Sequence, residues 1–236
     1  QGDCKNAFCQ GELPPAETTI IKPPSGDPDA EPGEYWLLRK TLYGLRQSPR
    51  EFWKYLSNAM VACDMQPSRM DPCLFVGPKV LAIAYVDDIL FWAKDETDIN
   101  DLAIRLREQG LLLEQEDDAA GFLGVRLSYT PDGKIEMKQT GLIDRVIETL
   151  GLDTKMAKSK WTPAEQKPLT RDETGEPWLG DFSYASVVGM LLYLSGHTRP
   201  DIAYAVNCCA RYMFCPRKSH EVALKRIGRY LKATRD

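Results

Sequence analysis

Two adjacent acids inside a long apolar stretch are the residues of this chain with the clearest capacity for chemistry. The stretch is VLAIAYVDDILFWA, residues 80–93, and its acids are Asp87 and Asp88. Both apolar arms are rich in β-branched and aromatic residues and are too short for a typical helix. The pattern therefore predicts two buried strands, with the acids at the tip of a tight hairpin. Such turns favour glycine, and neighbouring carboxylates repel each other unless a cation or a proton neutralises one. The pair indicates a metal site, with a solvated acidic turn as the alternative.

Asp3 is the candidate for a further acid at this site. Two divalent cations held about 3.5 to 4 Å apart catalyse in-line phosphoryl displacement, and clamping both requires an acid beside Asp87. Antiparallel pairing of the first residues with the central hairpin would place Asp3 there. The geometric hypothesis is therefore that Asp3 folds against the Asp87-Asp88 hairpin.

Composition bounds the class of protein. With 236 residues, 43% hydrophobic and 27% charged, the chain is long enough for one large domain or two small ones. It has no uninterrupted apolar run of about 18 residues, so we expect no membrane span. The seven cysteines include no CxxC pair, which favours reduced thiols in an intracellular protein over a disulfide framework or a zinc site.

Charge is unevenly distributed along the chain. The net charge of −4 by itself argues against a nucleic-acid partner. Residues 197–236, however, contain nine Lys and Arg against three Asp and Glu. This basic region either faces phosphates or forms solvated helix faces.

The elements that must position the acids follow from local patterns. Six prolines make residues 14–34 a loop, and Pro49 begins a helix with Ser48 as its N-cap. Pro131-Asp132-Gly133 marks the turn of a second hairpin. The other expected elements are strands near 34–42, 73–77, 122–129 and 134–138, helices near 95–110, 142–150, 183–196, 200–214 and 219–234, and a polar connector over 153–181.

Five sequence blocks, in order, carry a resemblance to a known family. YVDD at 85–88 resembles the metal-binding hairpin of reverse transcriptases, and DCKNAF at 3–8 resembles their first acidic motif. LYGLRQSPREFW at 42–53, FLGV at 122–125 and TRPDIAYAV at 198–206 are similar to the polyprotein of copia-type (Pseudoviridae-like) retrotransposons. The resemblance implies an α+β fold. A right-hand polymerase palm, an antiparallel sheet flanked by helices, would span residues 1–140 with a fingers remnant at 14–41, and a helical thumb and connection would span 141–236.

The resemblance also implies an activity and the residues that carry it. The chain would be an RNA-directed DNA polymerase that adds deoxynucleotides to a primer 3′ end with two Mg²⁺ ions, for which Mn²⁺ is a substitute. Asp3, Asp87 and Asp88 would be catalytic, and the metal shell would comprise these acids with the backbone carbonyl of Cys4. The incoming nucleotide would be contacted by Lys5, Asn6, Ala7, Phe8, Gln47, Tyr85 and Val86. Template and primer would be contacted by Arg46, Arg50, Phe122, Leu123 and Gly124. Phe8 matches the family's steric gate, a ring that leaves no room for a 2′-hydroxyl.

Partners and rival functions follow from the same resemblance. The partners would be an RNA or DNA template with primer, deoxynucleoside triphosphates, and the integrase and ribonuclease H segments of the same polyprotein. The expected location is a cytoplasmic virus-like particle or the nucleus. Because little precedes Asp3, we expect the fragment alone to polymerise poorly. The main alternative is an inactive, decayed or co-opted fragment that only binds nucleic acid or protein. An unrelated Mg²⁺-dependent nucleotidyltransferase or cyclase on a similar sheet would explain the acids but not LYGLRQSP and TRPDIAYAV.

Overall fold

The apolar arms of residues 80–93 form two paired strands, β6 (Val80–Tyr85) and β7 (Asp88–Ala93), as predicted. The structure is a computed structural model that describes residues 1–14, 16–115, 121–154 and 156–235, so Pro15 in the predicted loop and residue 155 in the predicted connector lie outside the described residues. Tyr85 pairs with Asp88, which leaves Val86 and Asp87 as a two-residue loop. The prediction that both acids occupy the hairpin tip is therefore wrong for Asp88, which is the first residue of β7.

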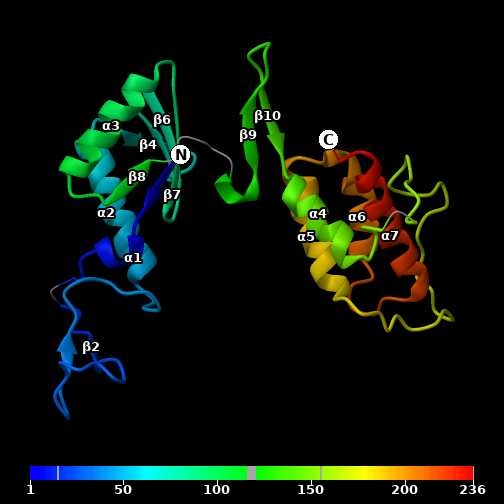
Figure 1. The fold of residues 1–236 in the computed structure, drawn as a ribbon, viewed down its shortest axis with the longest axis horizontal. Helices are drawn as coiled ribbons and strands as arrows, with labels where there is room; N and C mark the ends of the chain where they lie inside the picture. Colours follow the sequence, from blue (N-terminus) through cyan, green and yellow to red (C-terminus); the bar gives the residue numbers. More distant parts are fainter. Residues whose placement is uncertain (15, 116–120, 155, 236) are drawn as a thin grey trace. The chain divides into compact units, whose positions relative to one another are not determined.

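These strands belong to a six-stranded antiparallel sheet in the first of two compact units, Gln1–Phe122 and Leu123–Asp236. Its strand order is β4-β5-β6-β7-β1-β8 (Figure 1). The remaining strands of the sheet are β1 (Gly2–Cys4), β4 (Gln66–Pro67), β5 (Leu74–Val76) and β8 (Leu113–Gln115). The sheet thus joins the first residues of the chain to the central hairpin.

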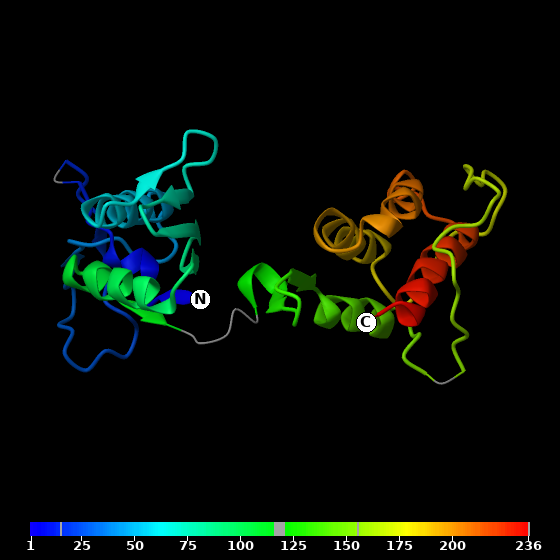
Figure 2. The same cartoon turned by 90° about the horizontal axis from the view of Figure 1, so that it is seen from above.

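Two helices cover one face of this sheet, α2 (Ser48–Ala62) and α3 (Glu96–Glu108), as Figures 1 and 2 show. Apolar side chains of both helices share one buried cluster with the sheet; from α2 they are Phe52, Leu56, Ala59 and Met60, and from α3 Leu102, Ala103 and Leu106. Burial alternates along β6, where Val80, Ala82 and Ala84 are buried and Leu81 and Tyr85 are exposed. The second face of the sheet therefore carries solvent-exposed side chains.

Smaller elements complete the first unit: α1 (Ala7–Gln10), and the paired strands β2 (Ile20–Ile21) and β3 (Trp36–Leu37). Pro49 lies in the first turn of α2, as predicted. The N-cap of α2 is Gln47, however, and the Ser48 hydroxyl donates a 2.5 Å hydrogen bond to the carbonyl of Leu42. The prediction of Ser48 as N-cap is wrong because this bond ties its side chain to the preceding turn.

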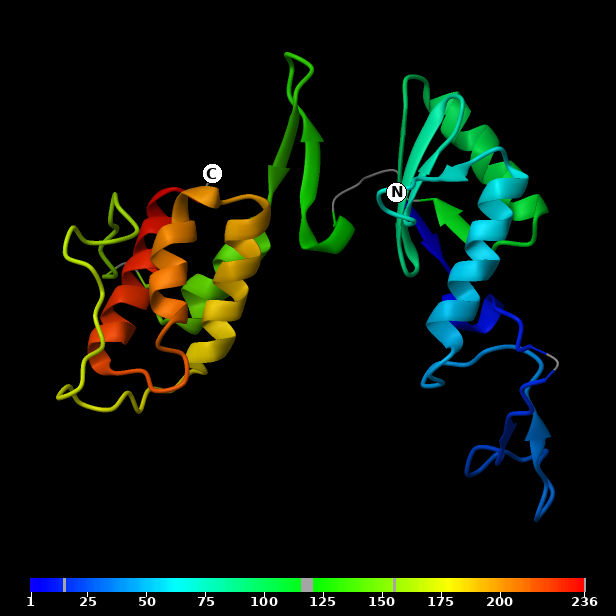
Figure 3. The ribbon, with the colours of Figure 1, turned by 180° about the vertical axis from the view of Figure 1, so that it is seen from behind.

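The second unit combines a hairpin with a group of helices (Figure 3). Its elements are β9 (Arg126–Tyr129), β10 (Ile135–Lys138), α4 (Thr140–Thr149), α5 (Tyr184–His197), the 3₁₀ turn η2 (Pro200–Ile202), α6 (Ala203–Ala210) and α7 (Lys218–Ala233). The helix predicted over 200–214 is thus η2 followed by a shorter α6. The buried core of the second unit includes Val187, Leu191, Val206, Leu224 and Ile227.

The TRPDIAYAV block contributes a polar network to the second unit. Arg199 donates to both carboxylate oxygens of Asp201, at 3.0 and 2.7 Å, and to the backbone carbonyl and side-chain hydroxyl of Thr234. The Tyr230 hydroxyl donates to Asp201 at 2.7 Å, and the Arg199 guanidinium lies 5.5 Å from the centre of the Tyr230 ring. The network joins η2 to the end of α7.

The structure is mixed α and β with antiparallel sheets and helices, in agreement with the α+β prediction and compatible with a reverse transcriptase domain. The units divide after Phe122, whereas the predicted boundary followed residue 140, because hairpin β9–β10 belongs to the second unit. The assignment of palm, fingers, thumb and connection stays a prediction. Among the helices of the described residues, none combines the length and apolar character needed to cross a membrane.

Candidate active site

Three acids lie in a row across the first sheet. Asp3 of β1 is directly opposite Asp88 of β7 on one side and Glu114 of β8 on the other. Directly opposed residues of antiparallel strands point to the same face, with their Cβ atoms about 4.5 to 5.5 Å apart. The register therefore places these three side chains on one face. It confirms that Asp3 folds against the central hairpin, where the residue directly opposite Asp3 is Asp88 rather than Asp87.

This row lies on the sheet face opposite the buried core. Gly2 and Cys4, the neighbours of Asp3, are buried, as is Leu113 beside Glu114. Side chains alternate along a strand, so Asp3 and Glu114 point away from the helices. Their side chains are 27% and 67% exposed. The uncovered face thus gives the acids access to ligands from solvent.

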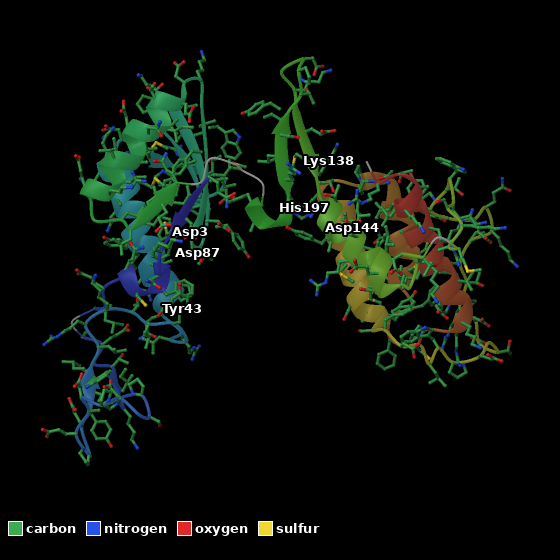
Figure 4. The ribbon with its side chains drawn as sticks, viewed as in Figure 1. Asp3, Tyr43, Asp87, Lys138, Asp144 and His197 are labelled. Carbon is green, nitrogen blue, oxygen red and sulfur yellow. The ribbon has the colours of Figure 1, made fainter. Side chains whose placement is uncertain are left out.

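Asp87 approaches β1 through its backbone. The Cys4 N–H donates a 2.7 Å hydrogen bond to the Asp87 carbonyl, and Figure 4 shows Asp3 and Asp87 together at this end of the sheet. The pKa of the Cys4 thiol is raised to about 12, first by burial and then by the negative charges of Asp3, Asp87 and Asp88. All three acids are therefore electrostatically close to Cys4.

Lys5 supplies the positive charge beside this row. Its Nζ lies 3.1 Å from Asp3 Oδ2 and 3.1 Å from Glu114 Oε2, and hydrogen bonds to Glu114 and Asp3 raise the pKa of its ammonium group. The Gln1 side-chain amide donates to Asp88 Oδ1 at 3.1 Å. Because opposed like charges destabilise a sheet, Lys5 and Gln1 reduce the repulsion that the row creates.

Val86 occupies a strained backbone position in the hairpin loop, with φ at 56°. Glycine is the residue usually found at such positions in two-residue hairpins, and a non-glycine residue there costs about 1 to 3 kcal/mol. Val86 and Tyr85, both predicted to contact the nucleotide, are 42% and 57% exposed. The last residue of β6 and the strained loop residue therefore present two uncovered side chains next to the acids.

The other predicted nucleotide contacts follow Asp3 along the chain. Lys5 and Asn6 are exposed, and Asn6 adopts a left-handed conformation that begins α1. Ala7 is fully buried. The Phe8 ring is half-buried, with its centre 4.9 Å from that of Tyr43 and 6.3 Å from that of Phe52. Packing against these two rings fixes the orientation of Phe8.

The predicted template contacts lie around the start of α2. Gln47 is half-buried, and Arg46 and Arg50 are exposed. The Arg50 Nε lies 3.6 Å from the Glu51 carboxylate, which also accepts a 2.9 Å bond from Lys54. Glu51 is buried, so part of this basic charge is paired within α2.

Phe122, Leu123 and Gly124 form a 3₁₀ turn, η1, rather than the start of a strand. Leu123 and Gly124 have φ values of 54° and 71°, and two consecutive left-handed residues interrupt an extended chain. The Leu123 carbonyl accepts a 2.6 Å hydrogen bond from the Tyr193 hydroxyl. The hairpin itself begins at Arg126, so the predicted strand over 122–129 is wrong for its first residues.

Many basic residues of the C-terminal region bind the rest of their own unit. Lys218, Arg226 and Arg235 lie 2.6 to 3.0 Å from Glu176, Glu165 and Asp144. Lys232 donates to the carbonyls of Leu152 and Thr154 at 2.8 and 2.7 Å. Much of the local excess of basic residues is therefore used in structural contacts. These contacts attach Asp144, Leu152, Thr154, Glu165 and Glu176 to α7 and to Arg235, which follows it.

No group of three or more His, Cys, Asp and Glu side chains within the described ranges is arranged to hold a metal ion by itself. The metal-ligand roles of Asp3, Cys4, Asp87 and Asp88 therefore stay predictions. Glu114, in contrast, joins the acid row without having been predicted. Little in the sequence indicated this position, because the strand that carries Glu114, LEQ, has only three residues and lies at the edge of the sheet.

Comparison with known proteins assigns the family. The family described as reverse transcriptase (RNA-dependent DNA polymerase) matches residues 1–166. The chain belongs to this reverse transcriptase family. Its predicted resemblance to copia-type elements is confirmed by relatives that are 30 to 34% identical.

The relatives of this reverse transcriptase chain include polyproteins of plant transposons. It is 34% identical to the retrovirus-related Pol polyprotein from transposon RE1 of Arabidopsis thaliana, with 99% of the chain and 16% of the polyprotein covered. It is 30% identical to that from transposon TNT 1-94 of Nicotiana tabacum, with 99% and 18% covered. The chain thus spans less than a fifth of either polyprotein. No solved structure matches the chain significantly.

Proposed function

We propose that the chain forms the polymerase site of a retrotransposon RNA-directed DNA polymerase, which adds deoxynucleotides to a primer 3′ end. The observation that carries this proposal is the sheet register, which holds Asp3 opposite Asp88 and beside the Asp87 loop. The reverse transcriptase family match over residues 1–166 supports it. A site of this kind needs acids from distant parts of the chain on one open surface.

The donor chemistry of the row suits divalent cations. Mg²⁺ binds carboxylate oxygens, and it usually takes only one or two protein carboxylates together with water and substrate phosphates. Asp3, Asp87 and Asp88 would supply these oxygens, with the Cys4 carbonyl as a further donor. When bound, two such ions lower the pKa of the primer hydroxyl and stabilise charge on the transferring phosphoryl group. The ammonium of Lys5 against Asp3 indicates that this position attracts positive charge.

The residues after Asp3 would bind the incoming nucleotide. Lys5 places an ammonium group next to the acids, where it can pair with a triphosphate. Asn6, Ala7, Tyr85, Val86 and Gln47 would line the sugar and base. The Phe8 ring, held by Tyr43 and Phe52, would exclude a 2′-hydroxyl by its fixed position. The chain's contribution is therefore to orient and select the nucleotide.

Template and primer would be the nucleic-acid partners. The exposed guanidinium groups of Arg46 and Arg50 would contact template phosphates, and the Phe122 to Gly124 turn would contact the primer. The relatives are Pol polyproteins, so the integrase and ribonuclease H segments of the same polyprotein are the proposed protein partners.

The test is primer extension on RNA and DNA templates with and without Mg²⁺. Because the chain spans 16% of the RE1 polyprotein, the assay uses both this chain and a longer segment of its reading frame. We expect Asp3→Asn and Asp87→Asn to abolish incorporation while circular dichroism stays unchanged. Asp101→Asn, which removes an exposed acid of α3, is the matched control and should retain activity.

Near-normal extension by the Asp87→Asn protein would refute the site. Absence of extension by the unsubstituted longer segment, with nucleic-acid binding retained, would instead favour the inactive fragment that only binds.

A further inference from the structure

Glu114 is a charged residue beside the proposed site, and none of the predicted catalytic or binding roles involves it. Across β7, β1 and β8 the acids follow the order Asp88, Asp3, Glu114. The Lys5 Nζ lies between the last two, 3.1 Å from each carboxylate. Lys5 therefore occupies the side of Asp3 that faces Glu114 rather than the side that faces the hairpin.

Without Glu114 this distribution of charge would change. Among the described residues, the contact that remains to the Lys5 ammonium would be with Asp3, whose other neighbour is Asp88 on the hairpin side. The Lys5 side chain is 49% exposed, and lysine has a flexible four-carbon stem, so little prevents it from moving toward that side. There it would compete with a divalent cation for the Asp3 carboxylate.

We propose that Glu114 is a positioning residue that holds Lys5 on the β8 side of Asp3 and so leaves the hairpin side of Asp3 available to a divalent cation. This inference rests on the proposed polymerase site. Glu114 does not bind the metal in this scheme; it acts through Lys5. It also keeps the ammonium group at the edge of the acid row, within reach of a triphosphate that approaches the same face.

The ion pairs of Lys5 with Asp3 and Glu114 are short but partly exposed. The effect of Glu114 on cation binding is therefore expected to be small but measurable. Partly exposed ion pairs contribute little, roughly a 1.4- to 5-fold change in an equilibrium constant. We therefore expect Glu114→Gln to weaken cation binding by about 2- to 5-fold.

The experiment measures binding of Mn²⁺ to the metal-free chain from the electron paramagnetic resonance signal of the free ion. The variants are Glu114→Gln, Lys5→Met and the double substitution, and Asp3→Asn identifies the binding that belongs to this site. Glu108→Gln, which removes an exposed carboxylate at the end of α3, controls for the loss of one negative charge. All the substituted side chains except Asp3 are exposed, so the variants are expected to fold.

The double-mutant cycle decides the inference, since only an effect through Lys5 disappears with Lys5. We expect Glu114→Gln to weaken Mn²⁺ binding in the unsubstituted chain but by less than about 1.5-fold in the Lys5→Met background. An equal loss in both backgrounds, or an equal loss in Glu108→Gln, overturns the positioning role while leaving the proposed function intact. Absence of Asp3-dependent Mn²⁺ binding in the unsubstituted chain overturns the proposed function as well.

Discussion

Replacing Arg199 by Ala is expected to loosen the second unit without touching the acid row. Arg199 joins η2 to α7 through Asp201, Tyr230 and Thr234. Its side chain is 15% exposed and that of Asp201 is 39% exposed. The substitution leaves a partly buried carboxylate with fewer donors and removes the guanidinium from the Tyr230 ring.

The exposures of the two partners set the magnitude. Breaking a fully buried ion pair costs about 3 to 5 kcal/mol, whereas an exposed pair contributes at most about 1 kcal/mol. This pair lies between the two cases, so Arg199→Ala should lower the unfolding free energy by about 2 to 3 kcal/mol. Tyr230→Phe, which deletes one hydroxyl donor to Asp201, should cost about 0.5 to 1.5 kcal/mol.

Hydrogen exchange of the α7 backbone amides measures the effect in the unit concerned. The expected loss corresponds to exchange that is about 30- to 150-fold faster. Arg171→Ala is the control, because that side chain is 83% exposed and only 3.8 Å from Glu173. If the α7 amides exchange no faster in Arg199→Ala than in Arg171→Ala, the Arg199 network does not stabilise α7.

The same network predicts a pH dependence. The hydrogen bond from Arg199 lowers the pKa of Asp201 in the folded chain. A carboxylate with a lowered folded pKa stabilises the protein fully above its unfolded pKa, near 3.9, and loses this contribution as pH falls through the folded value. The stability difference between the unsubstituted chain and Asp201→Asn should therefore be constant from pH 7 to about 5 and shrink below about pH 4.

Three predictions concern the first unit and the cysteines. Val86→Gly should raise the free energy of urea unfolding by about 0.5 to 1 kcal/mol, because glycine adopts positive φ without strain. A decrease in that free energy of more than about 1 kcal/mol would show that Val86 is not strained. Gly2→Ala should cost about 1 to 3 kcal/mol and weaken primer extension, because the added carbon would lie 2.9 Å from Leu113 Cδ1; unchanged stability would show that β1 tolerates it. Iodoacetamide at pH 8 should label exposed Cys215 but not Cys4, which is buried with a pKa of about 12; mass spectrometry of the folded chain decides this.

The sequence was sufficient for the central strands and their acids, because β-branched and aromatic residues dominate residues 80–93. It was insufficient for the loop between them. A valine at positive φ runs against local preference, so the turn was placed one residue too late. Pairing of β6 with β7, which closes the hairpin at Tyr85 and Asp88, overrides that preference. The strand predicted at FLGV was wrong for a related reason. Two residues of η1 are left-handed, and only Gly124 is of a type that indicates this conformation.

Long-range partners were the second limit. A count of charges marked residues 197–236 as basic, but Arg226 and Lys218 pair with Glu165 and Glu176 of the connector, and no local pattern links these positions. Glu114 was missed because its three-residue strand is too short for an alternating pattern. Its place beside Asp3 depends on the sheet order alone.

The three-residue strand β1 lies between β7 and β8, which are parallel to each other because each is antiparallel to β1. Without β1, these two strands would stand roughly 10 Å apart, twice the usual strand spacing. Removal of residues 1–5 would then expose two inner strand edges at once, and such edges pair readily with other chains. Truncation at the amino end should consequently cause aggregation as well as the loss of one acid.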